Sequence, residues 1–91
     1  MKRFHLIIRG KVQGVFYRAT ARKQATALGI KGFIRNLPDG SVELEAQGEE
    51  RQLDAFLHWC HDGPPNAQVD KVCVNWKLIT REEPSDFLIL G

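Results

Sequence analysis

The chain has 91 residues, of which 43% are hydrophobic and 26% are charged, an ordinary composition for one small folded domain. A chain of this length buries roughly 60–70% of the surface that its unfolded form exposes, so we expect one core and a single domain over residues 1–91. The longest apolar runs fall far short of the ~20 residues that cross a bilayer. The sequence therefore predicts an intracellular protein without a membrane segment or a signal peptide.

The charges are unevenly distributed along the chain. Residues 1–38 carry nine Lys and Arg and no Asp or Glu, whereas residues 39–91 carry four basic and eleven acidic residues. The first part is therefore predicted to bind anions, unless the two parts interleave in the fold and their charges average out. The count alone does not choose between a small phosphate ligand and nucleic acid. The two cysteines, Cys60 and Cys73, are too few for a disulfide scaffold and are expected to be reduced.

The first part of the chain predicts a strand, a loop and a helix. Residues 3–9 alternate between apolar and polar, which indicates a strand, and a glycine-bounded loop follows over residues 10–14. An apolar stripe with helical spacing then predicts a helix that ends at Gly29, and its members are Tyr17, Ala21, Ala25 and Leu28.

The second part predicts a hairpin, another helix and two more strands. Residues 31–37 and 41–47 flank Pro38-Asp39-Gly40, a combination typical of a tight turn. A helix beginning near Gly48 is predicted from its apolar stripe, which comprises Leu53, Phe56, Leu57 and Cys60. Gly63-Pro64-Pro65 ends this helix. Alternating apolar residues from Val72 to Leu78 predict a fourth strand, and residues 86–90 predict a short last one.

The order of these elements, β-α-β-β-α-β with an added terminal strand, is that of the ferredoxin-like split βαβ arrangement. We therefore predict an α+β sandwich in which two helices pack on one face of an antiparallel sheet, with a short C-terminal strand.

The segment Gly10-Lys11-Val12-Gln13-Gly14-Val15-Phe16-Tyr17-Arg18 runs from a strand through a glycine-bounded loop to the start of a helix. The N–H groups there lack partners within the helix, and the helix dipole favours an anion. Arg18 adds a planar guanidinium that can hold two phosphate oxygens. The segment lacks the patterns of nucleoside triphosphate and dinucleotide loops, so it predicts a small-anion site.

The motif GKVQGVFYR resembles the signature of the acylphosphatase family, Gly-x-Val-Gln-Gly-Val followed by two residues and Arg. Residues 32–48, GFIRNLPDGSVELEAQG, resemble its second signature in the same order and at the same spacing. The resemblance extends from about Phe4 to Leu90. Two positions depart from the family pattern, because Tyr17 stands where Phe or Met is usual and Ile34 where a smaller residue is usual.

The resemblance implies an enzyme that hydrolyses the carboxyl–phosphate bond of acyl phosphates to a carboxylate and inorganic phosphate, without a metal or cofactor. It implies that Arg18 and Asn36 are catalytic: Arg18 binds the phosphoryl group and Asn36 positions the attacking water. It also implies a phosphate-binding loop that comprises Gln13, Gly14, Val15, Phe16, Tyr17 and Arg18. The resemblance also implies a small cytoplasmic monomer that acts on a small-molecule acyl phosphate, whose physiological identity does not follow from the sequence.

Other functional interpretations rest on weaker patterns. His58 and His61 have a spacing found among metal ligands, but no second ligand pair completes a site, so they are expected only at a helix end. Glu43 and Glu45 share one strand face and are expected on a solvated sheet surface. RNA binding of the RRM type shares the element order, but the aromatic stacking platform is missing. A non-catalytic module that binds an anion or a protein partner remains the other alternative.

Overall fold

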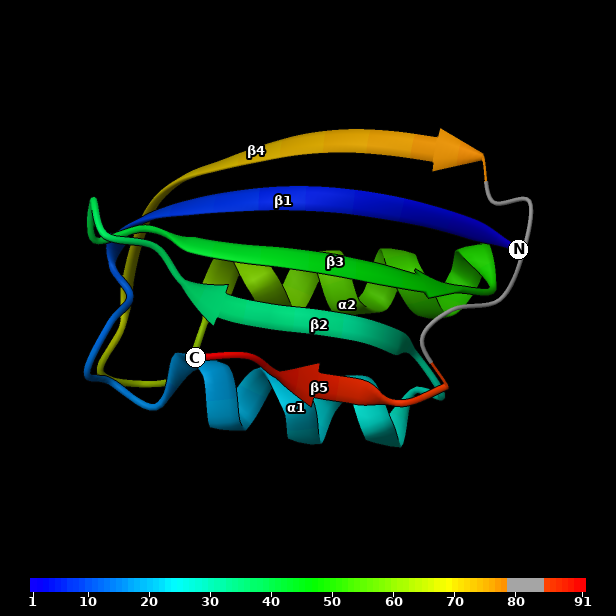
Figure 1. Cartoon of the computed structure of the whole chain (residues 1–91), viewed down its shortest axis with the longest axis horizontal. Helices are drawn as coiled ribbons and strands as arrows, with labels where there is room; N and C mark the ends of the chain where they lie inside the picture. The colour runs from blue at the N-terminus through cyan, green and yellow to red at the C-terminus, as the bar shows by residue number, and fades with distance from the viewer. Residues whose placement is uncertain (79–84) are drawn as a thin grey trace.

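The computed structural model describes residues 1–78 and 85–91. Its elements follow the predicted order (Figure 1). In chain order they are β1 (Lys2–Lys11), α1 (Tyr17–Ala27), β2 (Lys31–Asn36), β3 (Val42–Gly48), α2 (Glu50–Asp62), β4 (Gln68–Leu78) and β5 (Phe87–Ile89). Within these described residues, no helix is long and apolar enough to cross a membrane.

The strands form one five-stranded sheet in the order β4-β1-β3-β2-β5. The first four strands pair antiparallel, as expected, with Leu6 of β1 opposite both Leu44 and Val74. The sequence left the pairing of the short C-terminal strand open, and in the structure β5 pairs parallel with β2. β4 and β5 therefore form the two opposite edges of the sheet (Figure 1).

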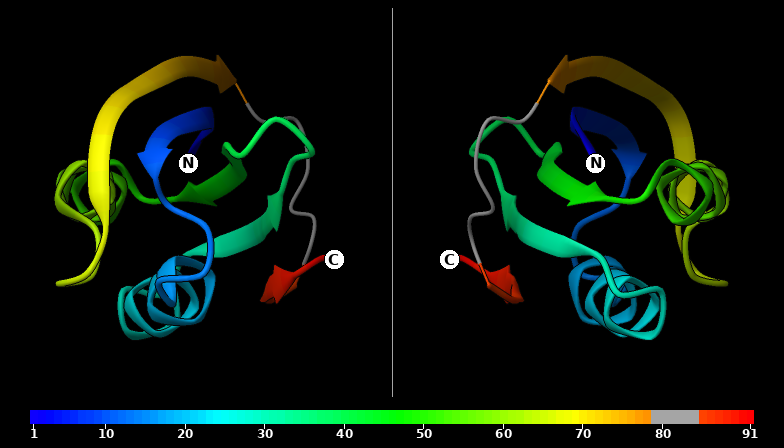
Figure 2. Two further views of the ribbon diagram at one scale, coloured as in Figure 1. Left: turned by 90° about the vertical axis from the view of Figure 1, so that its left-hand side faces the viewer. Right: turned by 90° about the vertical axis from the view of Figure 1, so that its right-hand side faces the viewer.

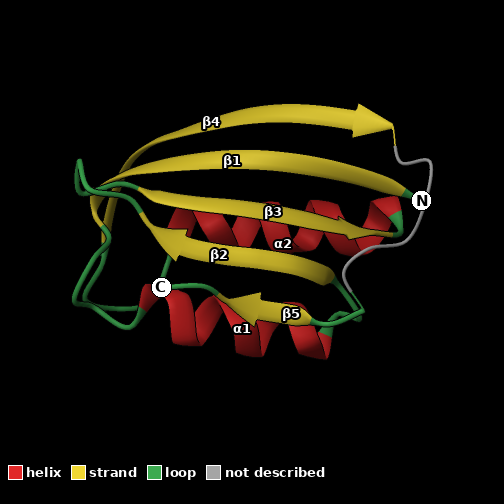
Figure 3. Ribbon diagram, viewed as in Figure 1, coloured by secondary structure: helices red, strands yellow, loops and turns green. Residues whose placement is uncertain are grey.

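Both helices pack on one face of the curved sheet (Figure 2). Alternate residues of β1 and β3 point toward them and are fully buried, while the residues between face the other side of the sheet. The predicted stripes of both helices supply the rest of the core, with Tyr17, Ala21 and Ala25 from α1 and Leu53, Phe56 and Cys60 from α2. A ferredoxin-like sandwich is therefore confirmed, and the colouring of Figure 3 separates its helix layer from its sheet layer.

β1 continues two residues beyond its predicted end and includes Gly10. The pairing of β1 with β4 shifts register between Arg9 and Gly10. Gly10 has φ of 130°, and a Cβ atom built there would lie 2.1 Å from the Gln68 carbonyl oxygen. Only glycine permits this close approach, which lets β1 bend toward the loop that follows.

Candidate active site

The loop between β1 and α1 turns through two residues in the left-handed backbone region. Gly14 has φ of 74°, which glycine adopts readily. Phe16 has φ of 65° and ψ of 22°, and it is the only non-glycine residue with positive φ in the described part of the chain. A side-chain-bearing residue in this region costs about 1–3 kcal/mol, and such strain concentrates at functional sites.

The start of α1 leaves backbone donors without partners inside the helix. The Phe16 carbonyl accepts the first helical hydrogen bond, from the Thr20 N–H at 3.0 Å, and no side chain caps the helix. The N–H groups of Tyr17, Arg18 and Ala19 therefore have no acceptor within α1. Together with the positive end of the helix dipole, they favour an anion at this position.

Tyr17 attaches the start of α1 to the end of α2. Its ring is buried, and its hydroxyl donates a hydrogen bond of 2.6 Å to the Cys60 carbonyl. In a continuing helix that carbonyl would accept from residue 64, but Pro64 has no N–H group. Tyr17 therefore supplies the missing donor, and its buried hydroxyl gains an acceptor. Burial raises the pKa of Tyr17 far above its usual range, so the hydroxyl stays a proton donor.

Arg18 is half-buried beside the end of the chain. Its Nη1 donates a hydrogen bond of 2.5 Å to the Gly91 carbonyl oxygen, and the preceding Leu90 N–H donates to the Ile34 carbonyl at 2.9 Å. Arg18 lines a hollow of about 320 Å³ together with Gly14, Phe16, Tyr17 and Ile89. A guanidinium has five N–H donors, so the remaining ones can bind an anion there.

Asn36 is the last residue of β2 and lies on the same strand face as buried Ile34, the side that the helices cover. Its Oδ1 atom is buried, and it has no hydrogen-bond partner within the described residues. A buried acceptor without a donor costs about 1–3 kcal/mol, so nearly all such atoms in folded proteins have a partner. This oxygen is therefore placed to accept a hydrogen bond from a bound water or substrate.

Gln13 connects the loop to the end of β2. Its Nε2 donates to two backbone carbonyls, those of Leu37 at 2.8 Å and Ser41 at 2.9 Å. Leu37 directly follows Asn36, and the loop and the β2–β3 turn lie at the same end of the molecule (Figure 1). The Gln13 side chain thus holds the loop against the strand end that carries Asn36.

The seven predicted site residues divide by exposure. Val15 and Tyr17 are buried in the core and anchor the loop, Gly14 and Phe16 are exposed, and Gln13, Arg18 and Asn36 are half-buried. Two separate links bring Arg18 and Asn36 to one end of the sheet. The first link is the pair of hydrogen bonds from Gln13. The second is the C-terminal segment, in which Leu90 is hydrogen-bonded to β2 and Gly91 is hydrogen-bonded to Arg18.

Sequence reasoning missed Ile89 and Gly91 as neighbours of the loop. The short apolar pattern at residues 86–90 indicated a strand but not the strand beside which it would pair. No other signal in the sequence pointed to these two residues.

Asp39 in the β2–β3 turn has neighbours that stabilise its ionised carboxylate. Asp39 accepts hydrogen bonds from the Ser41 side chain and, at 2.9 Å, from the Ser41 N–H, and it pairs with Arg9 at 3.1 Å. These hydrogen bonds, above all those from Ser41, lower the pKa of Asp39 to about 2. The ionised Asp39 side chain thus stabilises the turn that follows Asn36 through its contacts with Ser41 and Arg9.

The carboxylates on the open face of the sheet are more enclosed than expected. Glu43 contacts His5 at 2.9 Å and Arg35 at 2.5 Å, and its side chain is only 16% exposed. The hydrogen bond from His5, followed by that from Arg35, lowers the pKa of Glu43. Glu45 lies 3.4 Å from Lys77. Both glutamates are thus ion-paired rather than freely solvated.

The remaining candidates occupy helix and packing positions. His58 and His61 are exposed near the end of α2, with His58 lying 3.7 Å from Asp62. Among the described residues, no three His, Cys, Asp or Glu side chains group closely enough to hold a metal ion. Trp59 stacks on Phe56, and Trp76 contacts Phe4 edge-to-face, so both tryptophans pack against the core.

Comparison with known proteins identifies the family. The family profile described as acylphosphatase matches residues 4–89. The chain is 49% identical over 87 residues to an acylphosphatase from Marinobacter nauticus, covering 96% of this chain and 94% of the relative. It superposes on the crystal structure of acylphosphatase from Bacillus subtilis with a TM-score of 0.94 at 30% identity, covering both chains completely. An acylphosphatase structure from Coxiella burnetii aligns with a TM-score of 0.86 at 42% identity, over 98% of this chain and 92% of that one. The chain therefore belongs to the acylphosphatase family.

Proposed function

We propose that this protein hydrolyses acyl phosphates, with Arg18 and the N–H groups of residues 13–18 holding the phosphoryl group while Asn36 positions the attacking water. Family membership supports the reaction class. The observation that carries the assignment of roles is the buried, unpartnered Oδ1 of Asn36 at the end of the sheet where Arg18 lines a hollow.

The proposed reaction suits a site with few groups. The water oxygen forms a bond to phosphorus, the bond from phosphorus to the acyl oxygen breaks, and its electron pair leaves on the carboxylate. A carboxylic acid has a pKa of about 4, so this group departs as an anion without a general acid. The water proton passes to the phosphate or to solvent.

Charge stabilisation and positioning then account for the catalysis. Phosphoryl transfer passes through a loose transition state whose charge is spread over the phosphoryl oxygens. Arg18 and the N–H groups at the start of α1 complement that charge, and neither needs a metal or a cofactor. Asn36 accepts a hydrogen bond from the water through Oδ1, which orients a lone pair of the water oxygen toward phosphorus.

We also propose that residues 1–91 act as one monomeric domain in the cytoplasm, on small molecules rather than on nucleic acid. One core cluster joins residues from both ends of the chain, including Phe4 and Phe87. Cys60 and Cys73 are both free, and Cys73 is exposed, which suits a reducing compartment. On the open sheet face Glu43 and Glu45 pair with Arg35 and Lys77, so these cations are partly neutralised and attract a nucleic-acid backbone less, which supports a small-molecule substrate.

The test is the hydrolysis of benzoyl phosphate in EDTA by the wild type, Arg18→Ala and Arg18→Lys. We expect rapid release of phosphate by the wild type and a loss of about 10²–10³-fold in kcat/KM for Arg18→Ala, by analogy with removal of one preorganised oxyanion donor. Lysine should restore only part of the rate, because it presents a point charge and not a planar fork.

Arg51→Ala is the matched control, since Arg51 is exposed on α2 outside the loop. Wild-type turnover by folded Arg18→Ala would remove Arg18 from the mechanism. No turnover by the folded wild type would leave a non-catalytic anion-binding module.

A further inference from the structure

The outer surface of α1 concentrates positive charge that the fold does not neutralise. The helix, with the sequence YRATARKQATA, contains Arg18, Arg22 and Lys23 and no acidic residue. Elsewhere basic residues from the first part of the chain pair with acidic residues from the second, as in Lys2–Glu50 and Arg9–Asp39. Arg22 and Lys23 are exposed, and neither forms an ion pair or hydrogen bond with the described residues.

An open groove of about 810 Å³ runs beside these two cations. Arg22 and Lys23 line it, and Phe16, Ala19 and Ile89 line both this groove and the hollow that contains Arg18. The two depressions are therefore continuous. Among the described residues that line either of them, none is acidic.

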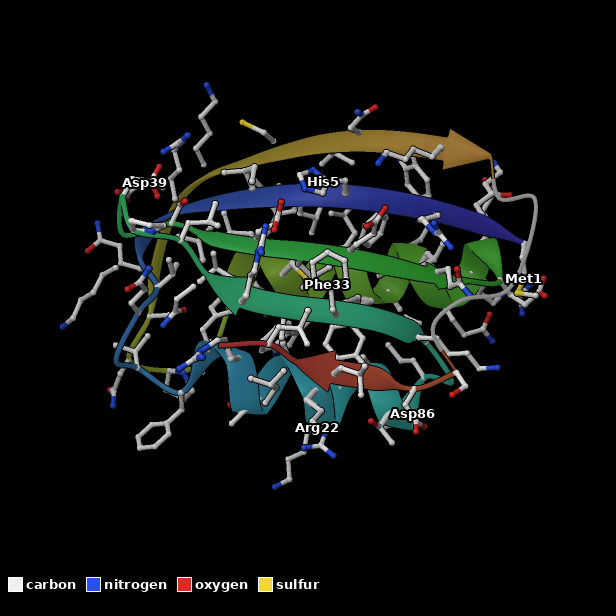
Figure 4. The ribbon with its side chains drawn as sticks, viewed as in Figure 1. Met1, His5, Arg22, Phe33, Asp39 and Asp86 are labelled. Atoms are coloured by element: carbon white, nitrogen blue, oxygen red, sulfur yellow. The ribbon has the colours of Figure 1, made fainter. Side chains whose placement is uncertain are left out.

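The spacing along the helix matches the length of a small acyl group. Arg22 is four residues after Arg18, so the two project from the same side of α1, about 6 Å apart along its axis. Figure 4 shows Arg22 on α1 beside the short edge strand β5. An acyl phosphate whose phosphoryl group lies at Arg18 can therefore place a second anion, a few bonds away, near Arg22 and Lys23.

Phe16 provides an apolar surface that lines both depressions. The residue is 77% exposed although it is held in the strained left-handed conformation. Together with Ile89, which is also exposed, it offers contacts to the carbon atoms between the two anionic groups of a substrate.

We propose that this groove is an acyl subsite, and that it selects acyl phosphates whose acyl part carries a second negative charge, such as a carboxylate or a phosphate ester. Arg22 and Lys23 attract that charge, while Phe16 and Ile89 contact the intervening carbons. The inference rests on the proposed acyl phosphate hydrolysis at Arg18 and names the class of substrate for that site.

The test compares two substrates that differ only in the second charge, benzoyl phosphate and 4-carboxybenzoyl phosphate. The readout is the ratio of their kcat/KM values, charged over uncharged. In Arg22→Gln/Lys23→Gln we expect this ratio to fall about three- to tenfold below the wild-type ratio, the size expected for losing two exposed ion pairs. The wild-type ratio should also fall in about 1 M salt, where the screening length is about 3 Å.

The matched control is Arg51→Gln/Lys71→Gln, which removes the same charge from exposed positions on α2 and β4. It should keep the wild-type ratio. A ratio unchanged in folded Arg22→Gln/Lys23→Gln, or lowered equally in the control, would overturn the subsite and leave the hydrolysis intact. If the wild type hydrolyses neither substrate, the proposed function fails, and the subsite fails with it.

Discussion

Asn36 combines two properties that a purely structural residue would not combine. It ends a paired strand, yet its buried Oδ1 has no donor within the described residues. In a structural asparagine, both the oxygen and the nitrogen of the side-chain amide would have hydrogen-bond partners. Each buried group without a partner lowers the free energy of unfolding by about 1–3 kcal/mol. This combination is what the proposed role of Asn36, positioning a water molecule, requires.

Asn36→Ala should therefore separate catalysis from phosphate binding. We expect kcat for benzoyl phosphate to fall about 10²–10³-fold, the cost of losing one preorganised hydrogen-bonding group. Inhibition by inorganic phosphate should change little, because Arg18 and the loop N–H groups remain. Asn75→Ala, at an exposed position on β4, is the control and should behave as the wild type. Equal losses in kcat and in phosphate affinity would instead assign Asn36 to binding.

Asp39 connects pH to the stability of the turn beside the site. Its pKa in the folded protein is about 2, below the ordinary value of about 3.9 for an unfolded chain. A carboxyl group with a lowered pKa stabilises the fold above its unfolded pKa, and it loses that contribution as pH falls through the folded value. The stability from Asp39 should thus be complete above about pH 4 and lost by about pH 2.

Asp39→Asn tests this prediction, because asparagine keeps an oxygen for the Ser41 N–H but carries no charge. We expect the free energy of unfolding, measured by urea titration, to be lower than that of the wild type above pH 4. The difference should shrink toward zero near pH 2. A difference that stays constant from pH 7 to pH 2 would show that the charge of Asp39 does not contribute.

At the scale of the elements, one hydroxyl joins the two helices. The Tyr17 hydroxyl donates to the Cys60 carbonyl, whose usual helical donor is absent because residue 64 is proline. Burial raises the pKa of the Cys60 thiol to about 12, so Cys60 remains a neutral packing group at this contact. The departure of Tyr17 from the family pattern thus has a local structural reason in the end of α2.

Tyr17→Phe keeps the buried ring and removes this donor. We expect the free energy of unfolding, measured by urea titration, to fall by about 1–3 kcal/mol, because the buried carbonyl is left without a partner. The loss should be the same between pH 5 and pH 8, since no charge is involved. Unchanged stability would mean that the Cys60 carbonyl finds another donor.

At the scale of the whole molecule, the local patterns were sufficient for most of the fold. Period-two alternation located β3, and the stripe at Tyr17, Ala21 and Ala25 located α1, because each pattern records which side of an element meets the core. Long-range pairing is not encoded in this way. The pattern of a three-residue strand does not specify that β5 pairs parallel with β2 at the edge of the sheet.

The candidate site was predictable in its motifs but not in its supporting contacts. The glycine loop and Arg18 follow one another in sequence, so their joint role could be inferred from it. The hydrogen bonds from Gln13 and the Arg18–Gly91 contact join residues 24 to 73 positions apart, and no local pattern reports them. The enclosure of Glu43 between His5 and Arg35 likewise arises from strands that meet only in the folded sheet.

The most direct test of the proposed mechanism is to follow the water oxygen into the products during turnover. Hydrolysis of benzoyl phosphate in ¹⁸O-water, followed by mass spectrometry of both products, reports which bond the enzyme cleaves. In the proposed mechanism, water held by Asn36 beside a phosphoryl group at Arg18 attacks phosphorus, so one ¹⁸O atom should appear in phosphate and none in benzoate. Label in benzoate would mean that water attacks the acyl carbon, and the roles proposed for Arg18 and Asn36 would then be wrong.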